Sequence, residues 1–138
     1  MKHKFIAIIG GGYWGKNLLR NLNELKVLVG CFDSNPQVRD KIKKEYSSLK
    51  VYQNKEELLN DKEVTAVCIA TPAITHGKLV ASALQAGKHV FVEKPMCLDV
   101  NEAKDLIKLS KKLDLKLMVG HLLLYHPAFI ALKNIINN

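Results

Sequence analysis

Two kinds of hydrophobic pattern alternate along the chain. Short apolar runs of strand length occupy residues 5–9, 27–32, 64–70, 89–92 and 115–119, with a shorter run at 50–52. Between them, apolar residues recur every three or four positions, which is the period of an amphipathic helix. Helices are therefore predicted over residues 14–25, 36–46, 55–59, 74–86 and about 99–113, with a last helix from residue 127 to the chain end.

This alternation of strand and helix, repeated about six times, predicts an α/β domain. The runs are apolar at successive positions, so helices are expected to cover both faces of the sheet. Right-handed crossovers then give a doubly wound open parallel sheet, the Rossmann fold. Residues 1–138 are accordingly expected to form one domain.

Residue types at the helix ends support these boundaries. Asn35 or Ser34 is expected to cap the helix that begins at residue 36. Asp99 or Asn101 is expected to cap the helix that ends near residue 113. Gly87 is suited to closing the helix over residues 74–86, because glycine readily adopts the left-handed conformation found after helix ends.

The net charge of +8 and the pI near 9.4 raise the question of nucleic acid. Arg20 and Arg39 are the only arginines, so the basic excess is almost all lysine. Because phosphate and guanine recognition favours arginine, and because the lysines fall on polar helix faces, we expect a solvated surface and no nucleic-acid partner. A weak positive field would still favour an anionic cofactor or a nucleotide-sugar.

Cysteine usage and hydropathy exclude further classes. Cys31, Cys68 and Cys97 are far apart in the sequence and form no C-x-x-C, so neither a disulfide nor a metal site is predicted. Residues 1–4 lead directly into an apolar run too short for a signal peptide. No run approaches the roughly 20 residues of a membrane span. The chain is therefore expected to be cytoplasmic, with no membrane partner.

The glycine-rich run that follows the first strand carries the first chemical signal. It reads G-G-G-Y-W-G and fits G-x-G-x-x-G between a strand and a helix, which is the context of a dinucleotide-binding loop. Gly10 permits the tight turn, Gly12 lets the backbone approach a pyrophosphate, and Gly15 allows helix and strand to pack closely. Tyr13 and Trp14, between them, are expected to border the cofactor.

Asp33 ends the second strand, about 20 residues further on, where a carboxylate accepts hydrogen bonds from the adenosine ribose. Ser34 beside it is the second residue expected at the ribose. A carboxylate repels a 2′-phosphate, and no arginine or lysine follows immediately, so NAD is predicted over NADP. The alternative interpretation is that Asp33 or Ser34 caps the next helix.

Three later segments add a family resemblance: A-T-P-A-I-T-H at residues 70–76, E-K-P at 93–95, and G-H with Y-H-P between residues 120 and 127. With the glycine loop, their order and spacing resemble the Gfo/Idh/MocA oxidoreductases, the family of glucose–fructose oxidoreductase and inositol dehydrogenase. The resemblance covers essentially the whole chain. It implies an NAD-dependent oxidoreductase acting on CH–OH groups of sugars, with E-K-P as the most specific segment.

The resemblance also implies roles for residues at the carboxyl ends of the strands. Thr71 and Pro72 would line the cofactor crevice, where open α/β sheets bind ligands. His76 would sit beside that loop with a mainly structural role. Glu93 would contact the nicotinamide ribose.

Lys94 is the catalytic residue that the resemblance implies, facing the nicotinamide and the sugar carbon being oxidised. A cation there can polarise the reacting oxygen, and partial burial would lower the lysine pKa and ease proton exchange near neutrality. Pro95 would shape the turn through a cis Lys94–Pro95 bond. Taken alone, Lys94 would be an ordinary surface lysine, and its two neighbours favour the catalytic role.

The segment after the sixth strand is implied to approach the ligands. His121 would lie at the cofactor edge, and Tyr125 and His126 would reach the substrate. The family often carries Asn or Asp where His126 stands, and either histidine could instead be a hydrogen-bonded packing residue. The run over residues 120–128 most resembles members that oxidise the 3-hydroxyl of nucleotide-linked amino sugars, such as UDP-amino sugars, or their uronic acids.

Family members continue into an α+β domain that carries most substrate contacts, a second catalytic group and most of the subunit interface. The chain ends at Asn138, so that domain is expected to be absent. We therefore expect a truncated dehydrogenase, the NAD-binding half, which turns over poorly alone. The alternative is a non-catalytic dinucleotide-binding module or remnant.

The last predicted helix carries a wide apolar stripe, with Lys133 and Asn134 on its other side. Without a covering domain, such a stripe favours self-association. A homodimer through this helix is therefore expected. The stripe consists of Ala128, Phe129, Ala131, Leu132, Ile135 and Ile136.

Overall fold

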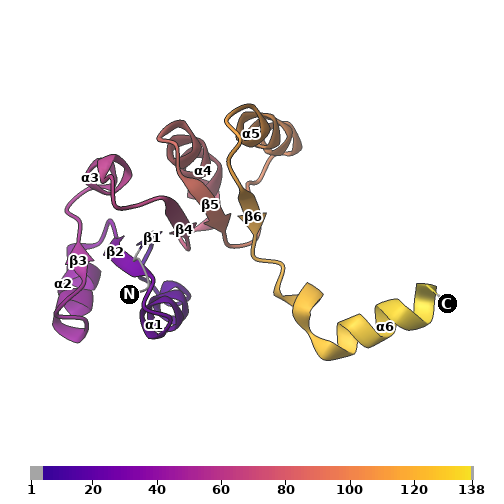
Figure 1. The fold of residues 1–138 in the computed structure, drawn as a ribbon, viewed down its shortest axis with the longest axis horizontal. Coiled ribbons are helices and arrows are strands. Elements are labelled where there is room, and N and C mark those ends of the chain that lie inside the picture. The colour runs from indigo at the N-terminus through magenta and orange to yellow at the C-terminus, as the bar shows by residue number, and fades with distance from the viewer. Residues whose placement is uncertain (1–4, 138) are drawn as a thin grey trace.

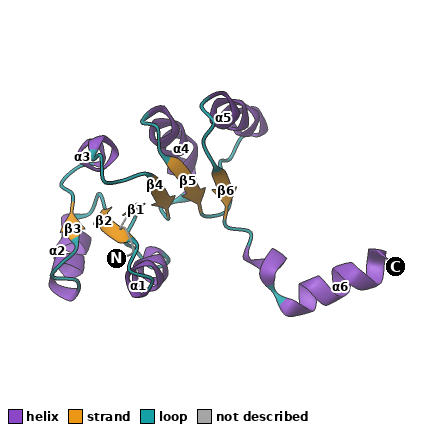
Figure 2. Cartoon of the chain, in the orientation of Figure 1, coloured by secondary structure: helices purple, strands orange, loops and turns teal. Residues whose placement is uncertain are grey.

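A parallel sheet of six strands forms the centre of the molecule, in the order β3-β2-β1-β4-β5-β6 (Figures 1 and 2). The structure is a computed structural model that describes residues 5–137. Residues 1–4, where no signal peptide was expected, and Asn138, where the last helix was predicted to end, lie outside the described residues. The strand order and the helices on both faces confirm the predicted doubly wound fold.

The elements follow the predicted alternation. The strands are β1 (Ile6–Ile9), β2 (Leu28–Phe32), β3 (Lys50–Val51), β4 (Ala66–Ile69), β5 (His89–Val92) and β6 (Leu117–Val119). The helices are α1 (Gly15–Glu24), α2 (Pro36–Glu45), α3 (Lys55–Asn60), α4 (His76–Gln85), α5 (Val100–Lys112) and α6 (Pro127–Asn137). Two short 3₁₀ turns, η1 (Ala73–Thr75) and η2 (Leu122–Tyr125), complete the described residues.

Each face of the sheet packs against its own layer of helices. Successive side chains of a strand point to opposite faces, so Ala7 and Ile9 of β1 join one core cluster and Ile8 joins the other. The first cluster lies under α3, α4 and α5, and the second under α1 and α2, which Figure 1 shows on opposite sides of the sheet. Because both layers bury apolar residues, the strands are apolar on both faces.

The structure decides between the capping residues that the sequence left open. The Asn35 side chain accepts a hydrogen bond from the Gln37 amide at 2.9 Å and caps α2. The Asp99 side chain accepts one from the Glu102 amide at 2.8 Å and caps α5. Gly87 has φ +73°, which confirms the predicted glycine close of α4.

Three predicted element starts are wrong by two residues, and one of them is the strand predicted over residues 64–70, which begins only at Ala66. The helix predicted over residues 74–86 begins as η1, because the Pro72 carbonyl accepts hydrogen bonds from both the amide and the hydroxyl of Thr75 and tightens this turn. The strand predicted over residues 115–119 starts only at Leu117. Asp114 has φ +53° and the Leu115 amide donates to the Ser110 carbonyl, so residue 115 still takes part in the turn that closes α5.

The C-terminal segment leaves the domain after β6. The turn η2, which the sequence did not predict, connects β6 to α6, and α6 extends away from the sheet (Figure 1). Its apolar side chains stay exposed, as do the leucines of η2. The predicted apolar stripe therefore faces solvent in this chain.

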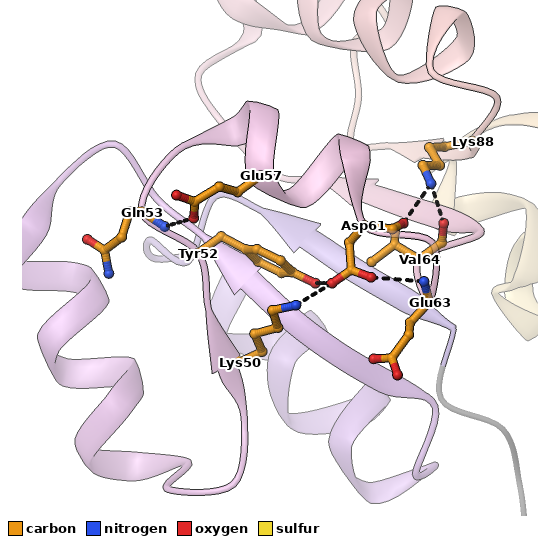
Figure 3. Close-up of polar contacts among 8 residues, drawn as sticks. All are labelled: Lys50, Tyr52, Gln53, Glu57, Asp61, Glu63, Val64 and Lys88. Atoms are coloured by element: carbon orange, nitrogen blue, oxygen red, sulfur yellow. Dashed lines mark hydrogen bonds and ion pairs between the residues drawn. The ribbon is translucent and has the colours of Figure 1, made fainter.

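A polar network at the amino-terminal edge of the sheet ties α3, β3 and the start of β5 together (Figure 3). The Asp61 carboxylate accepts hydrogen bonds from the Lys50 amine, from the Tyr52 hydroxyl at 2.9 Å and from the Glu63 amide at 2.9 Å. The Lys88 amine donates to the carbonyl oxygens of Asp61 at 2.9 Å and Val64 at 2.6 Å. We call these residues the Asp61 network, and they lie at the opposite end of the sheet from the carboxyl ends of the strands.

Among the helices of residues 5–137, none is both long enough and apolar enough to cross a bilayer.

Candidate functional site

Two adjoining clefts lie along the carboxyl ends of the central strands. The larger has a volume of about 790 Å³, and the smaller about 240 Å³. Ala70 and Thr71 line both, so the clefts meet at the end of β4. Of the predicted site residues, the larger cleft brings together Gly10, Gly12, Asp33, Ser34, Thr71 and Pro72. The smaller brings together Trp14, Thr71, His76, Glu93 and Lys94.

The glycine loop between β1 and α1 has the geometry predicted for a phosphate-binding turn. Gly10 has φ +98°, and a Cβ atom there would lie 2.5 Å from the Ala70 carbonyl oxygen. A Cβ at Gly15 would lie 2.0 Å from the carbonyl oxygen of Gly10, so helix and loop pack too closely for any side chain. A Cβ at Gly12 would meet nothing within 4 Å. Gly12 therefore leaves an opening at the start of α1, where backbone N–H groups favour an anion.

Asp33 ties the end of β2 to the glycine loop. Its Oδ2 accepts a hydrogen bond from the Gly11 amide at 2.8 Å, and its Oδ1 accepts one from the Asn35 amide at 2.8 Å. Because Asn35 caps α2, the alternative reading of Asp33 or Ser34 as the helix cap is wrong. The carboxylate retains lone pairs for a further donor at the wall of the larger cleft.

Three basic residues near the larger cleft were missed by the sequence reasoning. Arg39 folds back from α2, and its Nη1 donates to the carbonyl oxygens of Asp33 at 2.8 Å and Ser34 at 3.2 Å. Lys55 at the start of α3 and Lys78 on α4 line the same cleft. No motif signals them, because they come from three helices that only the fold brings together.

The turn after β5 carries Glu93 and Lys94. The Glu93 side chain is only 8% exposed, whereas Lys94 is exposed. The Lys94–Pro95 peptide bond is cis, as predicted. The partial burial expected for Lys94 is absent, because nothing in the described residues covers the tip of the turn.

His76 is buried between two loops. It is 1% exposed, with Nδ1 2.6 Å from the Pro95 carbonyl oxygen and Nε2 2.7 Å from the Thr71 carbonyl oxygen. The imidazole thus bridges the loops after β4 and β5, which agrees with a mainly structural role. A contact between His76 and a cofactor stays a prediction.

Several predicted residues lie outside both clefts. Tyr13 is exposed on a separate groove between α1 and α2. His121 and Tyr125 are exposed and line neither cleft. His126 is exposed too, and its Nδ1 accepts a hydrogen bond from the Ala128 amide at 3.3 Å at the start of α6. Leu122 at the start of η2 still lines the smaller cleft, but α6 extends away from the sheet, and Tyr125 and His126 line neither cleft.

The cysteines line neither of these clefts. Cys31 and Cys68 are buried in the sheet, where burial raises the pKa of each thiol to about 12. Within residues 5–137, no group of three or more His, Cys, Asp or Glu residues is arranged to hold a metal ion.

Comparison with known protein families gives one match over most of the chain. Residues 4–121 match the Gfo/Idh/MocA family, described as an oxidoreductase family with an NAD-binding Rossmann fold. The UDP-N-acetylglucosamine 3-dehydrogenase of Acidithiobacillus ferrooxidans is 34% identical over 133 residues, covering 96% of this chain and 42% of that protein. The NAD⁺-dependent scyllo-inositol 2-dehydrogenase of Bacillus subtilis is 31% identical over 138 residues, covering 96% of this chain and 40% of that protein.

Solved structures agree with these relatives. The structure of the same Acidithiobacillus enzyme superposes with a TM-score of 0.88 over 97% of this chain and 43% of that one. GenD2 from gentamicin A biosynthesis, solved in complex with NAD, superposes with a TM-score of 0.87 at 27% identity over 95% of this chain and 38% of that one. The chain therefore spans about two-fifths of the length of these relatives.

Proposed function

Since this chain belongs to the Gfo/Idh/MocA oxidoreductase family and is related to sugar dehydrogenases, we propose that it is the NAD-binding half of an enzyme that oxidises a sugar CH–OH group. The two adjoining clefts at the strand ends carry this proposal. One holds the phosphate loop and Asp33, and the other holds Glu93 and Lys94, the predicted nicotinamide end. One extended dinucleotide can thus reach both ends.

The residues present fit such a cofactor. The opening at Gly12 admits a pyrophosphate to the start of α1, which has no side-chain cap to compete for its N–H groups. The Asp33 carboxylate can accept a ribose hydroxyl, and Glu93 lines the cleft at the far end. Thr71 lines both clefts and Trp14 lines the smaller one, so these two residues lie between the phosphate end and the nicotinamide end.

The chemistry divides between cofactor and protein. Bound NAD supplies a nicotinamide ring that accepts a hydride from the carbinol carbon. When neutral, the Lys94 amine would hydrogen-bond to the hydroxyl on that carbon and accept its proton as the hydride leaves and the C–O bond becomes a carbonyl. Lys94 is exposed at the mouth of the smaller cleft, so it can reach a sugar that approaches from outside.

We further propose NAD over NADP. The Asp33 carboxylate would repel a 2′-phosphate, and the Arg39 guanidinium is engaged by the Asp33 and Ser34 carbonyls. Titration calorimetry with NADH and NADPH tests this on the wild-type chain, on Asp33→Ala and on Arg39→Ala. We expect the wild type to bind NADH more tightly than NADPH. The difference between the two affinities should be smaller in Asp33→Ala. Tighter NADPH binding by the wild type, lost in Arg39→Ala, would reverse the assignment.

The sugar class is proposed from the relatives. The UDP-N-acetylglucosamine 3-dehydrogenase of Acidithiobacillus matches across both clefts and the segment that follows β6. A UDP-linked amino sugar or its uronic acid is therefore the substrate to test first. His121, Tyr125 and His126 would contact it only when the segment after β6 lies against the clefts.

A second candidate is a dinucleotide-binding module without turnover of its own. The observation in its favour is that the implied substrate residues lie outside both clefts in this chain. Efficient hydride transfer needs an oriented substrate, since orientation supplies several kcal/mol of the barrier. We expect NADH binding but little sugar-dependent NADH formation by the 138-residue chain. Robust sugar-dependent NADH formation by this chain would rule out a binding module without turnover.

The exposed stripe of α6 supports a homodimer. Phe129, Leu132 and Ile136 line an apolar groove along the helix, and nothing in the described residues covers it. Burying this stripe against a second copy would remove the apolar surface from water. Light scattering should show a dimer at high concentration and a monomer for Leu132→Lys. A monomeric wild type at every concentration would rule the dimer out.

A further inference from the structure

One imidazole joins the two loops that form the nicotinamide end of the site. His76 opens α4, and its Nδ1 and Nε2 lie 2.6 and 2.7 Å from the carbonyl oxygens of Pro95 and Thr71. Thr71 follows β4, and Pro95 directly follows Lys94 on the turn after β5. The separation of these two loops is therefore set by the width of a single buried ring.

The two contacts require more protons than a neutral histidine carries. A carbonyl oxygen can only accept, whereas a neutral imidazole donates from one ring nitrogen and presents a lone pair at the other. With one proton, either the Pro95 or the Thr71 oxygen would face that lone pair. An imidazolium donates from both nitrogens, and both distances lie at the short end of the N–H···O range, as in charge-assisted hydrogen bonds.

The charges around His76 come from three elements. Glu93 shares the smaller cleft with the ring, and Glu102 of α5 places its carboxylate where a side chain on the residue after His76 would lie. Opposing them are the Lys94 amine on the turn and Lys78 on α4, both of which are exposed to solvent. The charges of Glu93 and Glu102 would favour a cation at His76, whereas its place at the positive end of α4 would oppose one.

We propose that His76 is a doubly protonated positioning residue that holds the Thr71 and Pro95 carbonyls and so fixes the turn that presents Lys94. The inference rests on the proposed function, because the turn matters only if a cofactor and a sugar meet there. Loss of one ring proton would release one of the two loops. The nicotinamide end would then be assembled in one protonation state of His76 and loosened in the other.

The protonation state can be measured without any cofactor. Ring ¹⁵N NMR of the labelled chain at pH 7, with His76→Asn to assign the signal, should show two protonated nitrogens for His76. His89 is an internal control, because its Nδ1 accepts a hydrogen bond from the Lys116 amide at 3.0 Å and must lack a proton there. A His76 ring with one unprotonated nitrogen at pH 7 would overturn the inference.

The positioning role is tested by chemical rescue. His76→Ala should bind NADH about tenfold more weakly, equivalent to about 1.4 kcal/mol, while the control His89→Ala binds like the wild type. Added imidazole, which can donate from both nitrogens when protonated, should restore affinity, and thiazole, of the same size without an N–H, should not. Unchanged affinity in His76→Ala, or equal rescue by both compounds, would contradict the positioning role.

These two measurements separate the two proposals. If the wild-type chain fails to bind NADH, the proposed function fails, and the ring NMR still decides how many protons His76 carries. If the wild type binds NADH and His76 shows a single ring proton, the proposed function stands and the inference is wrong. Thermal melting of His76→Ala shows whether its weaker binding reflects unfolding.

Discussion

Asp61→Asn should destabilise the fold in a pH-dependent way. The substitution keeps the size of the side chain and an oxygen that can accept the Glu63 amide, but it removes the negative charge that the Lys50 amine and the Tyr52 hydroxyl contact. The Asp61 side chain is 10% exposed, so water replaces these partners poorly. The network joins α3 to the edge strand β3, and its loss should lower the free energy of unfolding of the whole domain.

The size of the effect follows from the Asp61 pKa. The Lys50 hydrogen bond, against the opposing effect of burial, lowers the pKa of this carboxyl from 3.8 to about 2. A shift of that size corresponds to about 2.4 kcal/mol of stability when it is converted in full. The Lys50 side chain is 56% exposed, so solvent screens the pair, and about 1 to 2 kcal/mol is expected at pH 7.

The sign of the pH dependence is fixed by the direction of the shift. The folded-state pKa lies below the unfolded one, so the stabilisation is complete above about pH 5 and is lost as the pH falls from about 4 toward 2. The difference in unfolding free energy between wild type and Asp61→Asn, measured by urea unfolding from pH 7 to pH 3, should narrow toward the acid end. A gap that stays constant over this range would refute the electrostatic reasoning.

Asp105→Asn is the matched control. Asp105 pairs with Lys108 at 3.0 Å, but the two side chains are 73% and 77% exposed. Exposed pairs of this kind contribute between zero and about 1 kcal/mol. An equal loss of stability in both variants would show that the Asp61 network adds nothing beyond an ordinary surface charge.

Two further substitutions test the packing of the fold. Gly15→Ala should lower the melting temperature by several degrees, because its Cβ would lie 2.0 Å from the Gly10 carbonyl oxygen, and an unchanged melting temperature would disprove this close approach. Lys88→Met should lose about 1 to 3 kcal/mol in urea unfolding, since it removes the donor for the Asp61 and Val64 carbonyls, and a neutral result would mean that water replaces the amine.

The sequence was sufficient for the architecture because each signal is local. The apolar period distinguishes strand from helix, and both core clusters consist of the residues that this period selects. For the helix caps, the residue types narrowed the choice to two candidates at α2 and two at α5. Asn35 and Ser34 are equally good caps by type, and only the backbone decides which side chain reaches the free amide.

The site was predictable where a motif stands on one loop and not where several elements meet. The openness of Gly12 and the position of Asp33 follow from the turn between β1 and α1 and from the end of β2. The approach of Arg39 to the Asp33 loop depends on how α2 packs. The double contact of His76 also depends on the distance between two loops, which no sequence spacing encodes.

The position of the last helix shows a different limit. The apolar stripe of α6 was read correctly from its period, but a period gives only the face of the helix and not what covers it. In the structure α6 extends away from the sheet. His126 directly precedes this helix and accepts a hydrogen bond from the Ala128 amide at its start. The substrate roles implied for Tyr125 and His126 therefore depend on contacts that the sequence pattern could not place.

Cofactor binding at the glycine loop is the central property proposed for this protein. Calorimetric titration of NADH into wild type and Gly12→Val tests it, because a Cβ at Gly12 would meet nothing within 4 Å in the protein and should leave its melting temperature unchanged. We expect micromolar-range binding by the wild type and at least tenfold weaker binding by Gly12→Val, whose side chain would occupy the pyrophosphate opening. Equal binding by both, or no binding by the wild type, would contradict a dinucleotide site at this loop.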